Sequence, residues 1–188
     1  MALRYYLKQN GVATTITGGG DAFVKPTTPN SAAVLEFKSG QIAGGSEPAP
    51  YDVEMVQDGG TVLLSETGVT TILVVTQSFL SAHPAVVADL LKAQIQANDY
   101  IKSNPATAQT VANDELASYT GKPLKASVVA AAFKETTFTN DPDESSLTTD
   151  ATQAVSLSLL KPVSLNGIFD LGPLNKALAA AGESQVGS

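Results

Sequence analysis

The stretch TTILVVTQSFLSAHPAVVADLL, residues 70–91, decides the fold because its hydrophobic pattern changes partway along. Its first half is a run of β-branched and apolar residues, which favours a strand over Ile72–Val75. Its second half contains Pro84, a residue that fits the first turn of a helix. Apolar residues then recur at helical spacing as far as Ile101. The sequence therefore predicts a short strand followed by a long helix over residues 84–102.

The residues before this stretch alternate between short helical and strand-like segments. Helical spacing is present near residues 3–7, 31–37 and 53–56. Strand-favouring runs lie between and after them, at Thr14–Thr17, Ala22–Val24, Gln41–Ala43 and Thr61–Leu64. This alternation predicts an α/β fold, with a small mostly parallel sheet covered by helices.

The residues after this stretch have a helical pattern throughout. Pro105 restarts a helix that Gly121 ends, and three further amphipathic helices are predicted at about 125–134, 145–160 and 173–181. Their apolar faces need a partner layer that these residues scarcely supply. We therefore interpret the chain as part of a larger fold, in three segments: an α/β segment at 1–68, a crossover strand at 69–77, and a mainly helical part at 78–188.

Composition narrows the class of partner. The 188 residues include 11 Lys and Arg against 18 Asp and Glu, for a net charge of −7. This net charge argues against nucleic acid or an anionic membrane as a partner, because the negative charges of such a surface repel an acidic protein. It contains no cysteine, which excludes disulfides, thiol catalysis and cysteine-ligated zinc. No apolar run is long enough to cross a bilayer, and residues 1–8 lack the apolar core of a signal peptide.

The best candidate for a ligand site is the loop from Ser46 to Tyr51. It follows a predicted strand, and open α/β sheets present ligand groups at the ends of their strands. Ser46 can donate a hydrogen bond, Glu47 offers a carboxylate, and Tyr51 offers a wall and a hydroxyl. The plainer interpretation, which we favour, is a proline-stiffened turn that leads into a helix.

Three other features have plain structural interpretations. Gly18–Gly20 lacks the flanking residues of a phosphate-binding loop and is typical of a turn. His83, the single histidine, directly precedes Pro84 and is expected at a helix entry, not at a metal or catalytic centre. The acidic group Asp141, Asp143 and Glu144 lacks the glycine and distal glutamate of a calcium loop, and is expected to be a solvated turn.

Several segments together resemble one protein family. They are ALRYYLK (2–8), FKSGQI (37–42), LSAHPAVV (80–87), FTNDP (138–142), GIFDL (167–171) and PLN (173–175). In this order they resemble the C-terminal portion of ABC-transporter solute-binding proteins of the aliphatic sulfonate/nitrate/taurine family.

The resemblance implies a type II periplasmic-binding-protein fold whose first lobe is largely missing from this chain. Residues 1–68 would belong to the second lobe, 69–77 to the hinge, and 78–188 to the return into the first lobe. The implied ligand is a small sulfonate-like organic anion, and the implied partner of the full-length parent is an ABC permease. The implied location of that parent is extracytoplasmic, at the periplasm or cell surface. No cofactor, metal or enzymatic activity is implied.

The chain departs from the family at the loop. Relatives have an aromatic and an acidic residue where this chain has Ser46 and Ala49, so we expect impaired ligand binding. Two alternatives stay open: a helical interaction protein or non-binding remnant, and a pyrimidine-synthase-like enzyme of the same fold. The enzyme is disfavoured because those relatives rely on a histidine and a cysteine-rich motif. We also expect a homodimer, since the predicted strand Ile72–Val75 would leave an unpaired apolar edge.

Overall fold

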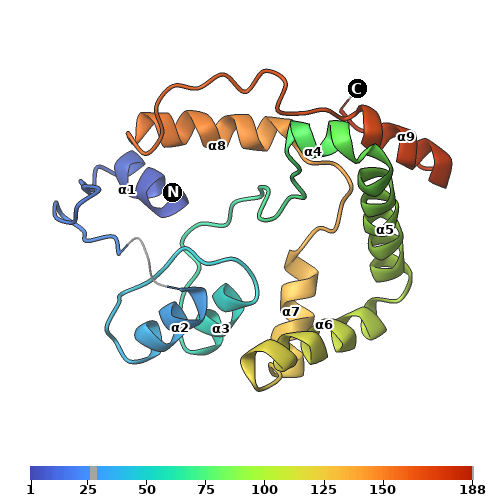
Figure 1. Cartoon of the computed structure of the whole chain (residues 1–188). Coiled ribbons are helices and arrows are strands. Elements are labelled where there is room, and N and C mark those ends of the chain that lie inside the picture. Colours follow the sequence, from blue (N-terminus) through green and yellow to red (C-terminus); the bar gives the residue numbers. More distant parts are fainter. Residues whose placement is uncertain (26–28, 188) are drawn as a thin grey trace. The chain divides into compact units, whose positions relative to one another are not determined.

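The computed structural model describes residues 1–25 and 29–187, and helices joined by irregular segments make up its architecture (Figure 1). Helix accounts for 54% of the residues and strand for 1%. The helices of the described residues are α1 (Ala2–Gln9), α2 (Asn30–Lys38), α3 (Tyr51–Gln57), α4 (Gln77–Ala82), α5 (Pro84–Ser103), α6 (Pro105–Thr120), α7 (Ala126–Glu135), α8 (Glu144–Ser156) and α9 (Gly172–Ala181).

The predicted α/β fold with a small, mostly parallel sheet is wrong. Within the described residues no sheet forms, and the β-structure is one isolated antiparallel bridge between Thr14 and Gly20. The strand-favouring runs Thr61–Leu64 and Ile72–Val75 are irregular, and Leu63 and Val74 are 77% and 70% exposed. A strand is stable only when a second strand satisfies its backbone groups, and no such neighbour is described for these runs. The type II periplasmic-binding architecture is therefore not what this structure contains.

The helix boundaries follow local signals. α5 and α6 begin at Pro84 and Pro105, where the missing backbone N–H costs nothing. α6 and α9 end at Gly121 and Gly182, both in the left-handed conformation that glycine adopts without strain. α8 ends at Ser156, earlier than the expected limit near residue 160.

The chain divides into two compact units. The first comprises Met1–Thr67 and Leu147–Ser164. Here α2 packs against α3, and each helix buries two apolar residues, which are Ala33 and Val34 in α2 and Val53 and Met55 in α3. An ion pair of 3.0 Å between Lys38 Nζ and Asp58 Oδ1 joins the ends of the two helices.

The second unit comprises Gly68–Ser146 and Leu165–Ser188. Its longest helix, α5, packs against α4, α6 and α9, and α6 packs against α7. Ile95 and Leu178 are almost fully buried, at 2% and 1% exposure, and α7 buries Val128, Val129 and Ala132. From its sequence, the chain is divided by its expected place in a larger parent fold, at 1–68, 69–77 and 78–188. That division stays a prediction.

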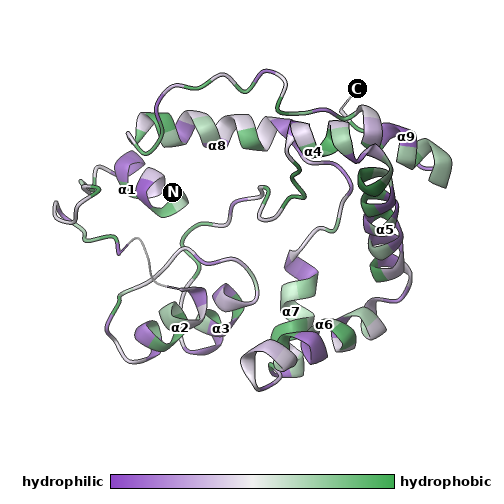
Figure 2. Cartoon of the chain, viewed as in Figure 1, coloured by the Kyte–Doolittle hydropathy of each residue, from purple (hydrophilic) through white to green (hydrophobic). Residues whose placement is uncertain are grey.

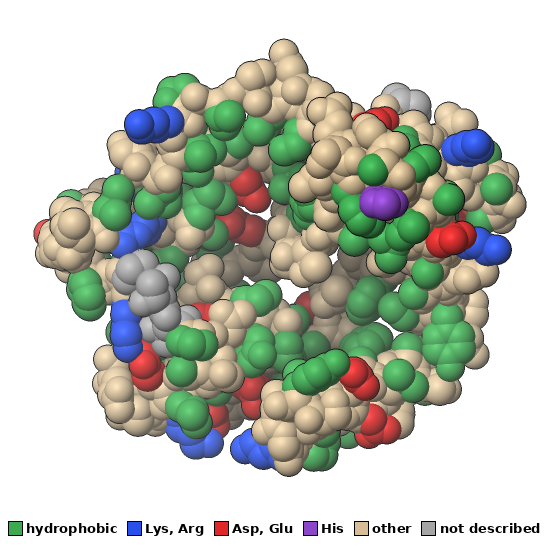
Figure 3. Space-filling model, in the orientation of Figure 1, with side chains coloured by type: hydrophobic (Ala, Val, Ile, Leu, Met, Phe, Trp, Pro, Cys, Tyr) green, Lys and Arg blue, Asp and Glu red, His purple; other side chains and the backbone are tan. Residues whose placement is uncertain are grey.

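Large apolar side chains remain on the surface of both units. Figure 2 shows hydrophobic residues on the helices and on the irregular segments, and Figure 3 shows many of them facing solvent. Phe23 is 70% exposed in the first unit and Val111 is 57% exposed in the second. None of the described helices is both long enough and apolar enough to cross a membrane.

Candidate ligand-binding site

The predicted site residues Ser46, Glu47 and Tyr51 lie in the first unit, on the loop that leads into α3. Tyr51 is the first residue of that helix. The Pro48 carbonyl accepts hydrogen bonds from the backbone N–H groups of Tyr51 at 3.0 Å and Asp52 at 3.5 Å. The loop is therefore a turn that opens a helix, as the plainer interpretation of the sequence expected. A ligand role for its side chains stays a prediction.

Glu47 carries a carboxyl group whose pKa is shifted by its position in this loop. Its side chain folds back over Gly45, where an added Cβ would lie 3.2 Å from Glu47 Oε1 and 3.4 Å from Met55 Cε. Partial burial, with a smaller contribution from the negative charge of Asp52, raises the pKa of Glu47 above its ordinary value of 4.5. The loop therefore holds a carboxylate whose negative charge is destabilised by its surroundings.

The hydroxyl groups of Ser46 and Tyr51 are the donors of the loop. Ser46 is exposed and Tyr51 is half-buried. Neither hydroxyl has a hydrogen-bond partner among the residues that the structure describes, so both are open to a ligand. The loop can thus donate two hydrogen bonds and accept others at Glu47. α3 holds it in place through the burial of Val53 and Met55 against α2.

The remaining sequence candidates are structural. Gly18–Gly20 forms a turn closed by the Thr14–Gly20 bridge. His83 precedes α5, and its ring lies 4.9 Å from that of Phe79. The Asp143 carboxylate accepts hydrogen bonds from the Ser145 hydroxyl and the Ser146 N–H, which lower the pKa of Asp143 and cap the start of α8. The described residues hold no group of three or more side chains suited to a metal ion.

A buried polar network in the second unit was not predicted. Asn98, which is 2% exposed, donates to the Thr139 carbonyl at 3.0 Å and to Asn140 Oδ1 at 2.6 Å. Asn140 in turn donates to Glu183 Oε2 at 3.1 Å. These contacts fasten α5 to the segments before α8 and after α9. Sequence reasoning missed the network because Asn98 lies on a helix face that otherwise has ordinary amphipathic spacing.

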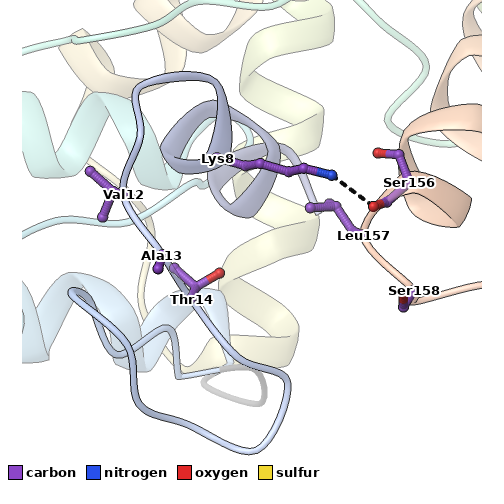
Figure 4. Close-up of a pocket in the computed structure, with 7 residues that line it drawn as sticks. All are labelled: Lys8, Val12, Ala13, Thr14, Ser156, Leu157 and Ser158. Carbon is purple, nitrogen blue, oxygen red and sulfur yellow. Dashed lines mark hydrogen bonds between the residues drawn. The ribbon is translucent and has the colours of Figure 1, made fainter.

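A pocket in the first unit was also missed by the sequence analysis (Figure 4). Lys8, Val12, Ala13, Thr14, Ser156, Leu157 and Ser158 line it. The two contributing segments are separated by more than a hundred residues, so no local motif marks them.

Comparison with known proteins gives one positive result. Neither curated proteins nor solved structures gave a match. The model of the NMT1-like family matches residues 1–114, which is more than half of the chain and includes the loop at Ser46–Tyr51. The resembling segments at 138–142, 167–171 and 173–175 lie outside the matched residues and stay predictions.

The matched family is related to the nitrate, sulfonate and taurine solute-binding proteins of ABC transporters. Its members are typically extracytoplasmic. The chain thus belongs to the NMT1-like family, a family of solute-binding, transport-related proteins of the periplasmic-binding type.

Proposed function

We propose that this chain acts as a solute-binding component for an ABC importer and takes a small sulfonate-like organic anion, without catalysing a reaction on it. The observation that carries the proposal is the family match, which covers the loop with the free hydroxyls of Ser46 and Tyr51. Hydroxyl groups are suitable donors for sulfonate oxygens, because neutral donors hold an anion without a buried counter-charge.

The carboxylates of the loop narrow the ligand class. The negative charge of Asp52 already repels that of Glu47. A ligand that carries only an anionic group would add a third negative charge beside them. A ligand that also carries an ammonium group removes this repulsion by facing that group toward Glu47. An aminosulfonate such as taurine therefore fits the loop better than a simple alkanesulfonate.

We further propose that binding is weak. Ser46 is exposed and the loop is one wall of a site, whereas the resemblance implies a ligand enclosed between two lobes. Water competes for hydrogen bonds at an open site, so each contact contributes little net free energy. A dissociation constant on the order of 0.1–1 mM follows for a site with only a few such contacts.

Titration calorimetry with taurine and with ethanesulfonate tests this proposal. For the wild type we expect taurine to bind more tightly than ethanesulfonate. The Glu47→Gln variant should weaken taurine binding several-fold and strengthen ethanesulfonate binding, because it removes both the partner of the ammonium group and the repulsion of the sulfonate. Glu54→Gln, which changes a carboxylate of α3 outside the loop, should leave both affinities unchanged. Equal effects of Glu47→Gln on the two compounds, or submicromolar binding of either, would refute the proposal.

A further inference from the structure

The pocket beside α1 is a second place in the first unit where a small molecule can lodge. Its volume is about 290 Å³, just below the range of about 300–1,000 Å³ that is typical of ligand sites. Lys8 comes from the last turn of α1, and residues 12–14 follow that helix. Ser156 is the last residue of α8, and residues 157 and 158 follow it. Figure 4 shows the Lys8 side chain extended toward Ser156, with Leu157 nearby. The pocket shares no residue with the loop at Ser46–Tyr51.

Lys8 is the only charged residue that lines this pocket. Its Nζ donates one hydrogen bond, of 2.8 Å, to the carbonyl oxygen of Ser156. An ammonium group has three N–H donors, so two remain for a ligand. No carboxylate of the described residues pairs with Lys8, although acidic residues outnumber basic ones by 18 to 11 in the chain. The pocket is therefore a local positive site in a negatively charged protein.

The other lining residues divide into hydroxyl groups and apolar groups. The side chains of Thr14 and Ser158 have no hydrogen-bond partner in the described part of the chain, and the Ser156 hydroxyl donates to the Gln153 carbonyl at 2.8 Å. Val12, Ala13 and Leu157 supply apolar surface. An ammonium group and hydroxyls next to a small apolar wall suit an acidic head group with a short hydrocarbon chain.

Hydrogen bonds fix the backbone at and next to the wall formed by residues 12–14. Arg4, only 6% exposed, donates to the carbonyls of Thr15 at 2.7 Å and Val24 at 3.1 Å. The Ala13 N–H donates to Asp21 Oδ2 at 2.9 Å. Gly20 closes the turn against the Ala13 carbonyl so tightly that a Cβ there would collide with it. A fixed wall spares a ligand the entropy cost of ordering it.

We propose that this pocket binds a small organic monoanion, with its acidic head group on Lys8 and the hydroxyls of Thr14 and Ser158, and its short apolar chain against Val12 and Leu157. The proposal does not depend on ligand binding at Ser46–Tyr51. The competing explanation is that Lys8 only ties α1 to the C-terminal end of α8 and complements the C-terminal end of the α1 dipole.

Acetylation footprinting with butyrate as the probe separates these explanations. The reactivity of each lysine is measured by mass spectrometry at increasing butyrate concentration. Binding predicts saturable protection of Lys8 by a factor of at least about three, while Lys92 and Lys176, which lie on helices of the second unit, stay unprotected. Butyramide, which has the same apolar chain without the charge, should protect none of them. Unchanged Lys8 reactivity, or equal protection by butyramide, would overturn the proposal.

Binding measurements on variants supply the second test. Saturation-transfer NMR with butyrate should show at least a fivefold loss of affinity in Lys8→Met and a smaller loss in Thr14→Val, with Lys92→Met equal to the wild type. Lys8→Arg should retain binding because it keeps the charge. Glu47→Gln should also retain it, which distinguishes this pocket from the proposed aminosulfonate site. A Lys8→Met variant that melts earlier but binds butyrate as the wild type does would show that Lys8 is only a structural tie.

Discussion

At the scale of single residues, two charged groups of the first unit, Glu47 and Arg4, lack a partner of opposite charge among the described residues. Glu47 lies partly buried near Asp52, and its pKa is raised. Arg4 is buried but bonds to two carbonyl oxygens and not to a carboxylate. A carboxylate with a raised pKa, such as that of Glu47, costs stability, and such groups are enriched at the functional sites of proteins.

The raised pKa of Glu47 predicts how stability depends on pH. Because the folded state binds this proton more tightly than the unfolded state, the contribution of Glu47 to the free energy of unfolding should fall as pH rises above about 4.5, the ordinary value. Glu47→Gln should remove that fall and stabilise the protein at neutral pH by less than about 1 kcal/mol, since solvent screens a partly exposed group. Urea denaturation at pH 4 and pH 7 measures the difference. A variant that is less stable than the wild type at pH 7 would contradict it.

Asn98 is the residue on which we expect the polar network of the second unit to depend. Replacement by alanine leaves the Thr139 carbonyl and Asn140 Oδ1 without their donor, which should cost about 1–3 kcal/mol of unfolding free energy. Gln96→Ala, an exposed polar position on the same helix, should change little. Chemical denaturation of the two variants checks this, and equal stabilities would show that the network does not hold the unit together.

At the scale of elements, helices were predictable and strands were not. Pro84, Pro105, Gly121 and Gly182 mark helix ends through their own backbone preferences, so their effect is readable from sequence. The run Ile72–Val75 has strand propensity, but it can form a strand only beside a second strand from another part of the chain. Local propensity does not reveal whether that second strand exists. The predicted loop at Ser46–Tyr51 was visible because its residues are contiguous, whereas the Lys8 pocket unites distant segments.

The packing of α5 against α9 is the main stabilising contact we expect to find by mutation in the second unit. Leu178 is 1% exposed, so Leu178→Ala should leave a cavity and cost about 2–5 kcal/mol. Leu90→Ala removes the same atoms from a side chain on α5 that is 41% exposed, and should cost clearly less. Thermal and urea unfolding of the pair measure the difference. Similar losses at the two positions would contradict the described packing.

At the scale of the whole molecule, the exposed apolar residues predict association. Apolar patches that remain in water favour binding to a second surface, and the irregular run around Leu73 and Val74 offers both side chains and free backbone groups. We expect a homodimer at micromolar concentration in sedimentation equilibrium. Val74→Lys should weaken dimerisation at least tenfold, and Val111→Lys, at an exposed position of α6, should not. A monomeric wild type would contradict this expectation.

Binding of a small zwitterionic anion by the first unit at Ser46–Tyr51 is the property on which the proposed function of this chain depends. The most direct test follows the backbone amide NMR signals of this unit while taurine is added. We predict saturable shifts at Ser46, Glu47 and Tyr51 at millimolar taurine, with a midpoint at several-fold higher taurine in Glu47→Gln and no change at α9. Amides in the loop that do not shift, while the protein remains folded, would contradict the claim that this chain is a solute-binding protein of the proposed kind.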